Sequence, residues 1–197
     1  MRVFVAGGSG VLGRRLVTLL VARGHQVTAT TTSADKLALL AELGATGVVM
    51  DGLDGAAVGE AVATAGPDAI VNQMTGLSAA HAGKPNPRRP DRFFATTNRL
   101  RSEGVDQLLA AAQATDVRQI VSQGHASMNG IRTGGWVTTE DDPLEVLAGT
   151  TAIQHLEDAV VGASGAVLRY GGFYGTGVAA GAGEMADGGA SWRTPGR

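Results

Sequence analysis

The sequence contains no cysteine, and this absence excludes several kinds of site. Without thiols the chain has no disulfide framework, no cysteine-ligated zinc or iron–sulfur centre and no thiol nucleophile. No apolar run approaches the roughly 18 residues that a membrane-spanning helix needs. The formal net charge of −2 is not the basic charge typical of nucleic-acid-binding proteins. We therefore expect a cytoplasmic protein with no bound metal that binds neither membranes nor nucleic acids.

Glycine is the residue present in excess. The 197 residues include 30 glycines, about 15% of the chain and roughly twice the average share. Hydrophobic residues make up 44% and charged residues 17%, a composition typical of a folded domain rather than a disordered tail. The length suits one domain with a single core, or one domain plus a short extension.

Short β-branched segments alternate with amphipathic segments, which predicts βαβ units and a parallel sheet. The expected strands are 2–6, 26–30, 46–50, 69–73, 118–122 and 166–170. The expected helices are 11–23, 35–43, 53–65 and 150–163, with a further long helix after the proline-rich loop 81–92. Right-handed crossovers then favour an α/β fold with a Rossmann-type, doubly wound parallel sheet of strand order 3-2-1-4-5-6.

The long helix carries one stripe of small and apolar residues, at positions 97, 100, 104, 108 and 111. Gly104 in the middle of this stripe costs about 1 kcal/mol of helix propensity against alanine. A close approach to a neighbouring element would explain the glycine.

A glycine-rich loop lies between the first expected strand and the first expected helix. Gly7 permits a tight turn, Gly10 lets a pyrophosphate approach the backbone, and Gly13 lets the helix pack close to the sheet. The helix dipole and free backbone N–H groups then face the phosphates. The residues predicted to bind a dinucleotide here are Gly7, Gly8, Ser9, Gly10, Val11, Leu12 and Gly13. The alternative is that residues 7–13 form a glycine-rich turn that binds no nucleotide.

The end of the second strand bears on the choice between NAD and NADP. An acidic residue there holds the ribose 2′-OH of NAD, and a basic residue accommodates the 2′-phosphate of NADP. The run from Thr30 to Ser33 carries neither charge, and Lys36 lies one helical turn further on. The hydroxyls of Thr32 and Ser33 together with this lysine favour NADP slightly over NAD.

Two further segments fall where the strand ends should border the ligand crevice. The carboxylate of Asp51, after the third strand, can accept a hydrogen bond from the adenine amino group, although Asp-Gly is also a common turn dipeptide. The second segment closes the fourth strand. The cofactor-binding residues predicted here are Asp51, Gly52, Leu53, Gln73, Met74 and Thr75.

These motifs resemble the short-chain dehydrogenase/reductase superfamily, in its extended or atypical branch of NAD(P)-dependent epimerase/dehydratase-like proteins. The resemblance rests on the Gly-x-x-Gly-x-x-Gly spacing of 7–13, on 51–53 and on 168–177, with support from 98–101, 141–144 and 153–157. In the family, the run that resembles 168–177 lines the nicotinamide side of the site. The resemblance therefore implies that Tyr170, Gly171 and Phe173 bind the cofactor.

The chain departs from the family at the catalytic pair, Tyr-x-x-x-Lys on the helix after the fifth strand. Gly149 and Ile153 stand at the matching positions, and no other tyrosine and lysine in the chain can form the pair. The weak candidates for catalysis are Ser122, His125 and Ser127. His125 has a suitable pKa for proton transfer, but a lone histidine in a polar loop is more often a surface residue.

The expected domain organisation is an NAD(P)-binding domain over 1–177 and a Gly/Ala-rich tail over 178–197, the stub of a substrate domain that extended members carry. The expected function is that of an NAD(P)-dependent oxidoreductase or epimerase-like protein, acting on a sugar-nucleotide-like or small carbonyl substrate. The alternatives are a non-catalytic redox sensor or scaffold and an inactive fragment. The expected partners are the dinucleotide, a small-molecule substrate and a second copy in a homodimer.

Overall fold

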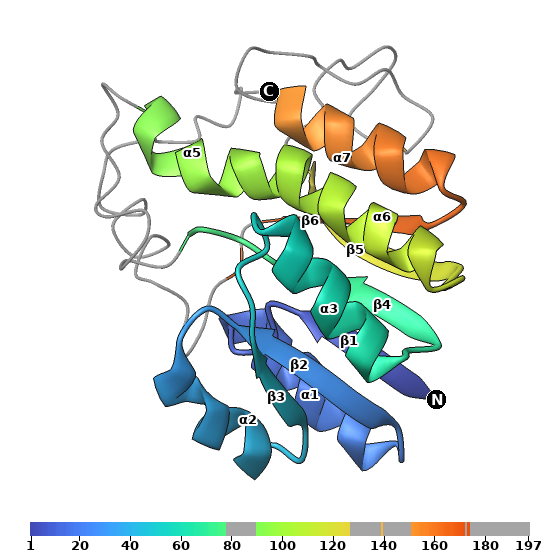
Figure 1. Cartoon of the computed structure of the whole chain (residues 1–197). Helices are drawn as coiled ribbons and strands as arrows, with labels where there is room; N and C mark the ends of the chain where they lie inside the picture. Colours follow the sequence, from blue (N-terminus) through green and yellow to red (C-terminus); the bar gives the residue numbers. More distant parts are fainter. Residues whose placement is uncertain (78–89, 127–138, 140–150, 172, 174–197) are drawn as a thin grey trace, which may run out of the picture.

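Six strands form one parallel sheet in the computed structural model, which describes residues 1–77, 90–126, 139, 151–171 and 173. The strands are β1 (Arg2–Ala6), β2 (Gln26–Thr31), β3 (Thr46–Val49), β4 (Ala69–Asn72), β5 (Gln119–His125) and β6 (Ala166–Tyr170). Their order is β3-β2-β1-β4-β5-β6, which confirms the predicted order. Every neighbouring pair is parallel, so the carboxyl ends of all six strands lie at one edge of the sheet (Figure 1).

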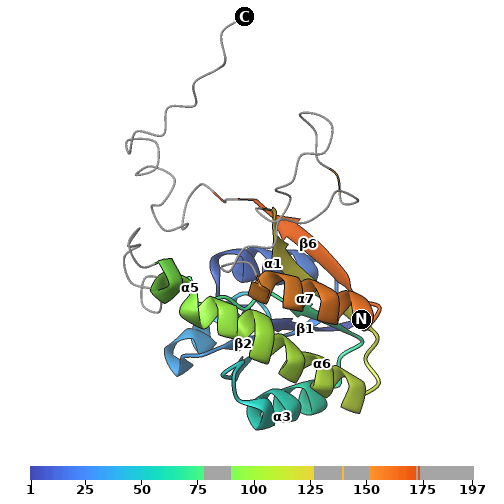
Figure 2. The ribbon, with the colours of Figure 1, turned by 90° about the horizontal axis from the view of Figure 1, so that it is seen from above.

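Helices cover both faces of this sheet. One face carries α1 (Val11–Ala22) and α2 (Leu37–Glu42), the latter preceded by the 3-10 turn η1 (Ala34–Lys36). The other face carries α3 (Gly55–Ala65), α6 (Val105–Ala114) and α7 (Thr151–Gly162). Figure 2 shows α1 and α3 on opposite sides of the strands. The right-handed crossovers of a doubly wound sheet produce this division of the helices.

The alternation of side chains along β1 creates two hydrophobic cores. Val3 and Val5 pack in one buried cluster with Val17 of α1. Phe4 packs in the other cluster, with Val58 of α3 among its members. A strand that is buried on both faces requires apolar residues at successive positions, which explains the continuous apolar run of β1.

One long helical segment is made of α5 (Pro90–Arg99), the π-helical turn η2 (Leu100–Gly104) and α6. The predicted stripe of this segment is buried: Thr97, Leu100, Gly104, Leu108 and Ala111. A Cβ on Gly104 would lie 3.2 Å from the carbonyl oxygen of Gly52, so the glycine does allow a close approach. The loop prediction is wrong for residues 90–92, because the helix begins at Pro90. Proline is tolerated there because the first helical N–H groups have no intrahelical partner.

Several predicted boundaries are wrong at the ends of elements. β5 continues to His125, three residues past its predicted end, because its last residues pair with β6. His125 therefore lies within a strand rather than in a loop after it. The third helix begins at Gly55, since Asp54 caps it by accepting hydrogen bonds from two backbone N–H groups of its first turn.

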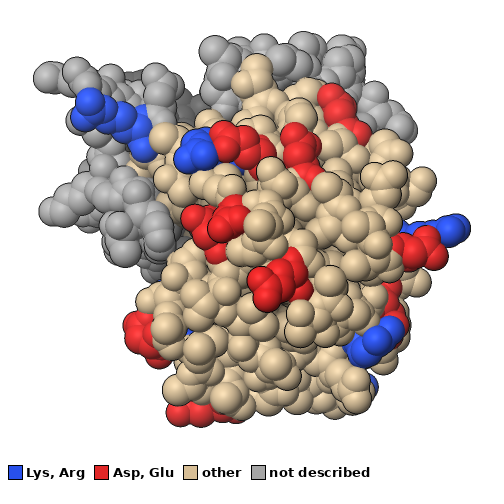
Figure 3. All heavy atoms as spheres, in the orientation of Figure 1, with Lys and Arg blue, Asp and Glu red and all other residues tan. Residues whose placement is uncertain are grey.

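One face of the molecule shows how the charged side chains are distributed. On the face seen in Figure 3, which includes α3 and α6, the acidic side chains are scattered among neutral ones. None of the described helices has the length and apolar character to cross a membrane. The expected tail over 178–197, and residues 81–89 of the expected proline-rich loop, lie outside the described residues.

Candidate functional site

The glycine loop after β1 has a backbone that requires glycine at its first position. Gly7 has a φ of +83°, in the left-handed region that residues with a Cβ rarely adopt. A Cβ here would also lie 2.7 Å from the carbonyl oxygen of Gln73. The N–H of Gly7 donates to Oγ1 of Thr30 at 2.9 Å, and the N–H of Gly10 donates to the carbonyl of Gly7 at 3.1 Å. The ends of β1, β2 and β4 thus hold the loop in place.

The backbone N–H groups in the first turn of α1 are not hydrogen-bonded to a capping side chain. Gly10 is the N-cap of the helix, makes no side-chain cap hydrogen bond and is followed by no acidic residue in the first turn. A Cβ on Gly10 would meet only the carbonyl oxygen of Gly7, at 3.2 Å. This end of α1 can therefore receive an anion, because its orphan N–H groups and the helix dipole both favour negative charge.

The close packing of α1 against the loop depends on Gly13. This residue is buried, and a Cβ on it would lie 2.8 Å from Cα of Gly8 and would overlap the carbonyl oxygen of Gly7. Both of those atoms belong to the backbone of the loop, so neither can rotate away. Gly7, Gly10 and Gly13 thus have the geometry that their spacing predicts.

The end of β2 is tied to the glycine loop through hydroxyl groups. Ser9 Oγ donates to Thr31 Oγ1 at 3.0 Å, and Thr31 is almost completely buried. Thr32 is exposed, whereas the hydroxyl of the half-buried Ser33 donates to the carboxylate of Asp35. The end of β2 therefore exposes the hydroxyl of Thr32 and has the carboxylate of Asp35 close by.

The turn after β3 is built around Asp51. Its Oδ1 accepts a hydrogen bond from the N–H of Leu53 at 2.9 Å, and the residue remains exposed. Gly52 is buried beneath Met74 and Leu100, whose side chains would contact any Cβ on it. The turn proposed for adenine binding therefore does form, and it packs against the end of β4.

The ends of β4, β5 and β6 are joined by a cluster of amides and one phenol. Nε2 of Gln73 donates to the hydroxyl of Tyr170 at 3.3 Å, and Nε2 of Gln123 donates to the carbonyl of Met74 at 3.1 Å. Gln73 is 92% buried, and its Oε1 has no hydrogen-bond partner within the part of the chain that the structure describes. A buried acceptor without a donor is costly, so this atom is suited to a ligand that brings an N–H or O–H group.

The segment after β6 adds an aromatic pair to this side of the crevice. The rings of Tyr170 and Phe173 lie edge to face, with centroids 5.3 Å apart. Phe173 is about half exposed, and Gly171 is exposed with nothing within 4 Å of a Cβ placed on it. The pair lies on the face of the sheet opposite α7, because Arg169, the preceding residue, pairs with Glu157 of that helix.

The candidate catalytic residues occupy different environments. Ser122 is fully buried, and its Oγ accepts a hydrogen bond from Nδ2 of Asn72 at 3.0 Å. His125 is half-buried at the carboxyl end of β5, where burial and the nearby charge of Arg101 lower its pKa. Ser127 lies outside the described residues. Ser122 lies in register with Asn72, the last residue of β4, and His125 ends β5, so both lie near the edge where ligands of such sheets bind, but only His125 is partly exposed.

Sequence reasoning missed Arg101 and Gln123. Arg101 lies on η2, and the stretch around it drew attention only for its family resemblance. Gln123 lies in the part of β5 that was expected to be a loop. Their proximity to His125 and Gln73 arises from packing between distant segments, which no local pattern indicates.

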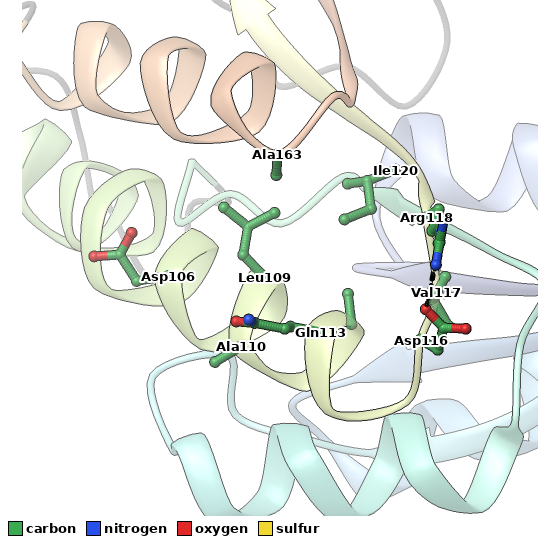
Figure 4. A pocket seen from close by; sticks show the side chains of 10 residues that line it. Asp106, Leu109, Ala110, Gln113, Asp116, Val117, Arg118, Ile120 and Ala163 are labelled. Atoms are coloured by element: carbon green, nitrogen blue, oxygen red, sulfur yellow. Dashed lines mark hydrogen bonds and ion pairs between the residues drawn. The ribbon is translucent and has the colours of Figure 1, made fainter.

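A surface cavity of about 560 Å³ lies away from this crevice. Leu109 and Gln113 of α6, Ile120 of β5 and Ala163 after α7 are among its lining residues (Figure 4). It therefore lies toward the amino end of β5, whereas the glycine loop lies at the carboxyl edge. The exposed ion pair of Arg118 and Asp116 borders it.

Comparison with known proteins identifies the family. The sequence matches a family described as NAD(P)H-binding over residues 7–169. The chain belongs to this NAD(P)H-binding family. The cradle of glycines and the orphaned Oε1 of Gln73 fit a dinucleotide, whose pyrophosphate needs N–H donors and whose carboxamide carries an N–H group.

One curated relative is a reductase. A Streptomyces protein named 3-diazoavenalumate denitrifying reductase is 39% identical over 202 residues, which cover 98% of this chain and 62% of the relative. The chain therefore spans about three fifths of that protein's length.

Crystal structures of epimerases share the fold. They include UDP-glucose 4-epimerase of Thermus thermophilus in complex with NAD, at 24% identity and a TM-score of 0.69, covering 89% of this chain and 56% of that one. Another is UDP-glucose 4-epimerase of Thermotoga maritima with UDP-glucose, at 17% identity and a TM-score of 0.72, covering 89% and 57%. At these identities the similarity extends to the fold alone, and it agrees with the expected membership of the short-chain dehydrogenase/reductase superfamily.

Proposed function

We propose that this chain binds NADP(H) along the carboxyl edge of its sheet and forms the nucleotide-binding part of a reductase. The observation that carries the proposal is the start of α1, where Gly10 leaves the backbone N–H groups without a side-chain cap or an acidic neighbour. A pyrophosphate accepts hydrogen bonds from such groups and lies at the positive end of the helix dipole. Adenine then extends toward Asp51, and nicotinamide toward Gln73 and Tyr170.

The end of β2 favours NADP(H) over NAD(H) in this proposal. The hydroxyl of Thr32 and the ammonium of Lys36 are exposed, and both can bind a 2′-phosphate. Asp35 opposes this preference, although the hydroxyl of Ser33 donates to its carboxylate. Lys36→Ala should weaken NADPH binding about tenfold and leave NADH binding unchanged, whereas Asp35→Asn should strengthen NADPH binding. Tighter binding of NADH than of NADPH by the unaltered chain contradicts the preference.

The missing Tyr-x-x-x-Lys pair bears on the substrate, since Gly149 and Ile153 stand at its positions. Bound NADPH would supply a hydride. A hydride added to a carbonyl carbon leaves an alkoxide, which needs a proton on its oxygen, whereas a hydride that replaces N₂ on the carbon of a diazonium cation gives a neutral product with no proton required. We therefore propose as the substrate a diazo compound that reacts as its diazonium cation, rather than a small carbonyl compound or a sugar nucleotide. The name of the Streptomyces relative supports this choice.

In the proposed reaction, the residues of this chain bind and orient the cofactor and the substrate, and they transfer no proton. Gln73 and Tyr170 form one wall of the nicotinamide position and hold each other through the 3.3 Å hydrogen bond. Burial and the charge of Arg101 lower the pKa of His125, which favours its neutral form. The neutral ring therefore adds no further positive charge that would repel a diazonium cation.

The test is a turnover assay with a labelled cofactor. The NADPH-bound chain is mixed with an arenediazonium salt, and loss of NADPH absorbance, release of N₂ and deuterium transfer from C4-labelled NADPH into the arene are followed. A mixture without protein measures the uncatalysed reaction. We expect rates above that control and deuterium in the product. Turnover of carbonyl compounds without any diazo reduction would contradict the proposed substrate.

A non-catalytic role as an NAD(P)-binding redox sensor or scaffold is the second candidate. The missing Tyr-x-x-x-Lys pair favours it, because cofactor binding needs only the glycine loop. Stoichiometric binding of NADPH with no turnover of diazo or carbonyl compounds would support this role. Diazo reduction by the chain would exclude it.

A further inference from the structure

Arg101 is a partly buried arginine that forms no ion pair within the described residues. Arg2, Arg99, Arg118 and Arg169 each form an ion pair with a carboxylate. Arg101 is half-buried, and among the described residues its guanidinium makes only one hydrogen bond, from NH1 to Oδ1 of Asn98 at 3.3 Å. Because a guanidinium carries five N–H donors, most of its binding capacity is unused.

Arg101, with its unused N–H donors, lies beside the crevice. The residue lies on η2, which packs against α7, and its charge acts on His125 at the carboxyl end of β5. On α7, Ile153 is almost completely buried and apolar, at the position where family members carry their catalytic lysine. In the described part of this region, the positive charge therefore comes from Arg101 on η2, and not from a lysine on α7. π-Helical turns of this kind occur frequently at functional sites.

The partial burial of the Arg101 charge favours binding of an anion. Burial lowers the pKa of the Arg101 guanidinium, which means that its charged form has lost hydration. A charge taken out of water is costly unless an opposite charge and hydrogen bonds replace the lost solvent. The Asn98 amide is neutral and supplies one acceptor only. A carboxylate would supply the opposite charge and two acceptors in the geometry that a guanidinium matches.

We propose that Arg101 is the anion-binding residue of the substrate site, and that the substrate carries a carboxylate that pairs with it. This inference rests on the proposed function, since it assumes that the substrate enters beside the nicotinamide. The carboxylate binds Arg101, and its charge offsets that of the guanidinium near the reacting group.

The test compares binding of a simple aryl carboxylate with that of its neutral amide. Benzoate and benzamide are titrated by calorimetry into the chain saturated with NADP⁺. Three variants accompany the unaltered protein: Arg101→Gln, Arg101→Lys and the control Arg118→Gln, which removes an exposed arginine at the opposite edge. Benzoate should bind at least tenfold more tightly than benzamide. Arg101→Gln should abolish that difference, Arg101→Lys should retain part of it, and Arg118→Gln should leave it unchanged.

Nuclear magnetic resonance of the His125 ring gives a second readout, with His125→Gln used to assign the signal. Benzoate should raise the pKa of His125 in the unaltered chain, because it neutralises the charge of Arg101. In Arg101→Gln, benzoate should have no effect on this pKa. Equal benzoate affinity in the unaltered chain and Arg101→Gln, or no saturable benzoate binding at all, would overturn the inference. Failure to bind NADP⁺ would instead contradict the proposed function, and the benzoate titration of the cofactor-free chain still tests Arg101.

Discussion

Gly13→Ala is expected to disturb the loop that receives the pyrophosphate. Alanine gains about 1 kcal/mol of helix propensity over glycine. Its Cβ would, however, lie 2.8 Å from Cα and 2.9 Å from the carbonyl carbon of Gly8, and it would overlap the carbonyl oxygen of Gly7. Overpacking of this kind costs about 1–3 kcal/mol. We expect a net loss of up to about 2 kcal/mol, a fall in Tm of up to about 5 °C, and NADPH binding weakened at least tenfold as the loop shifts.

Gly59→Ala provides the matched control. Gly59 lies within α3, and no atom lies within 4 Å of a Cβ placed on it. This variant keeps the whole propensity gain, so it should be more stable by about 1 kcal/mol and bind NADPH as the unaltered chain does. Urea unfolding gives the stabilities and calorimetry gives the affinities. Unchanged NADPH affinity in Gly13→Ala would refute the assignment of this loop to the pyrophosphate.

Three further predictions concern stability. Glu157→Gln removes the buried carboxylate that pairs with the partly buried Arg169, so urea unfolding should show a loss of about 3–5 kcal/mol; a loss below 1 kcal/mol would contradict this pairing. Thr30→Val removes the acceptor of the Gly7 N–H, which should cost about 1–2 kcal/mol and speed hydrogen exchange at that amide; unaltered exchange would exclude this hydrogen bond. The pKa of His125 is lowered in the fold, so the unfolded chain binds more protons and stability should fall as pH drops from about 6.5 through the folded pKa. His125→Gln should flatten this dependence, and an identical pH profile for the variant would argue against it.

Local patterns were sufficient to predict the sheet and the glycine loop. β1 and its alternating cores follow from a run of apolar residues, Gly7 has the positive φ of a local tight turn, and Gly13 packs against loop residues only five or six positions away. The strand order follows from the handedness of crossovers, which does not depend on sequence detail.

Contacts between distant segments could not be predicted. β5 reaches His125 only because β6 pairs with its end. The hydrogen bond from Gln73 to Tyr170 joins residues 97 positions apart. The desolvation of Arg101 arises from the packing of helices around it. Such features depend on tertiary packing, which hydrophobic periodicity does not encode. They concern the nicotinamide and substrate side of the crevice.

Calorimetric titration of NADPH and NADH into the unaltered chain tests the central claim most directly. The free N–H groups behind Gly10 and the cradle formed by Gly7 and Gly13 predict saturable binding of one dinucleotide per chain. NADPH should bind more tightly than NADH, and binding should raise the Tm of the chain. No binding of either cofactor at millimolar concentration would contradict the account.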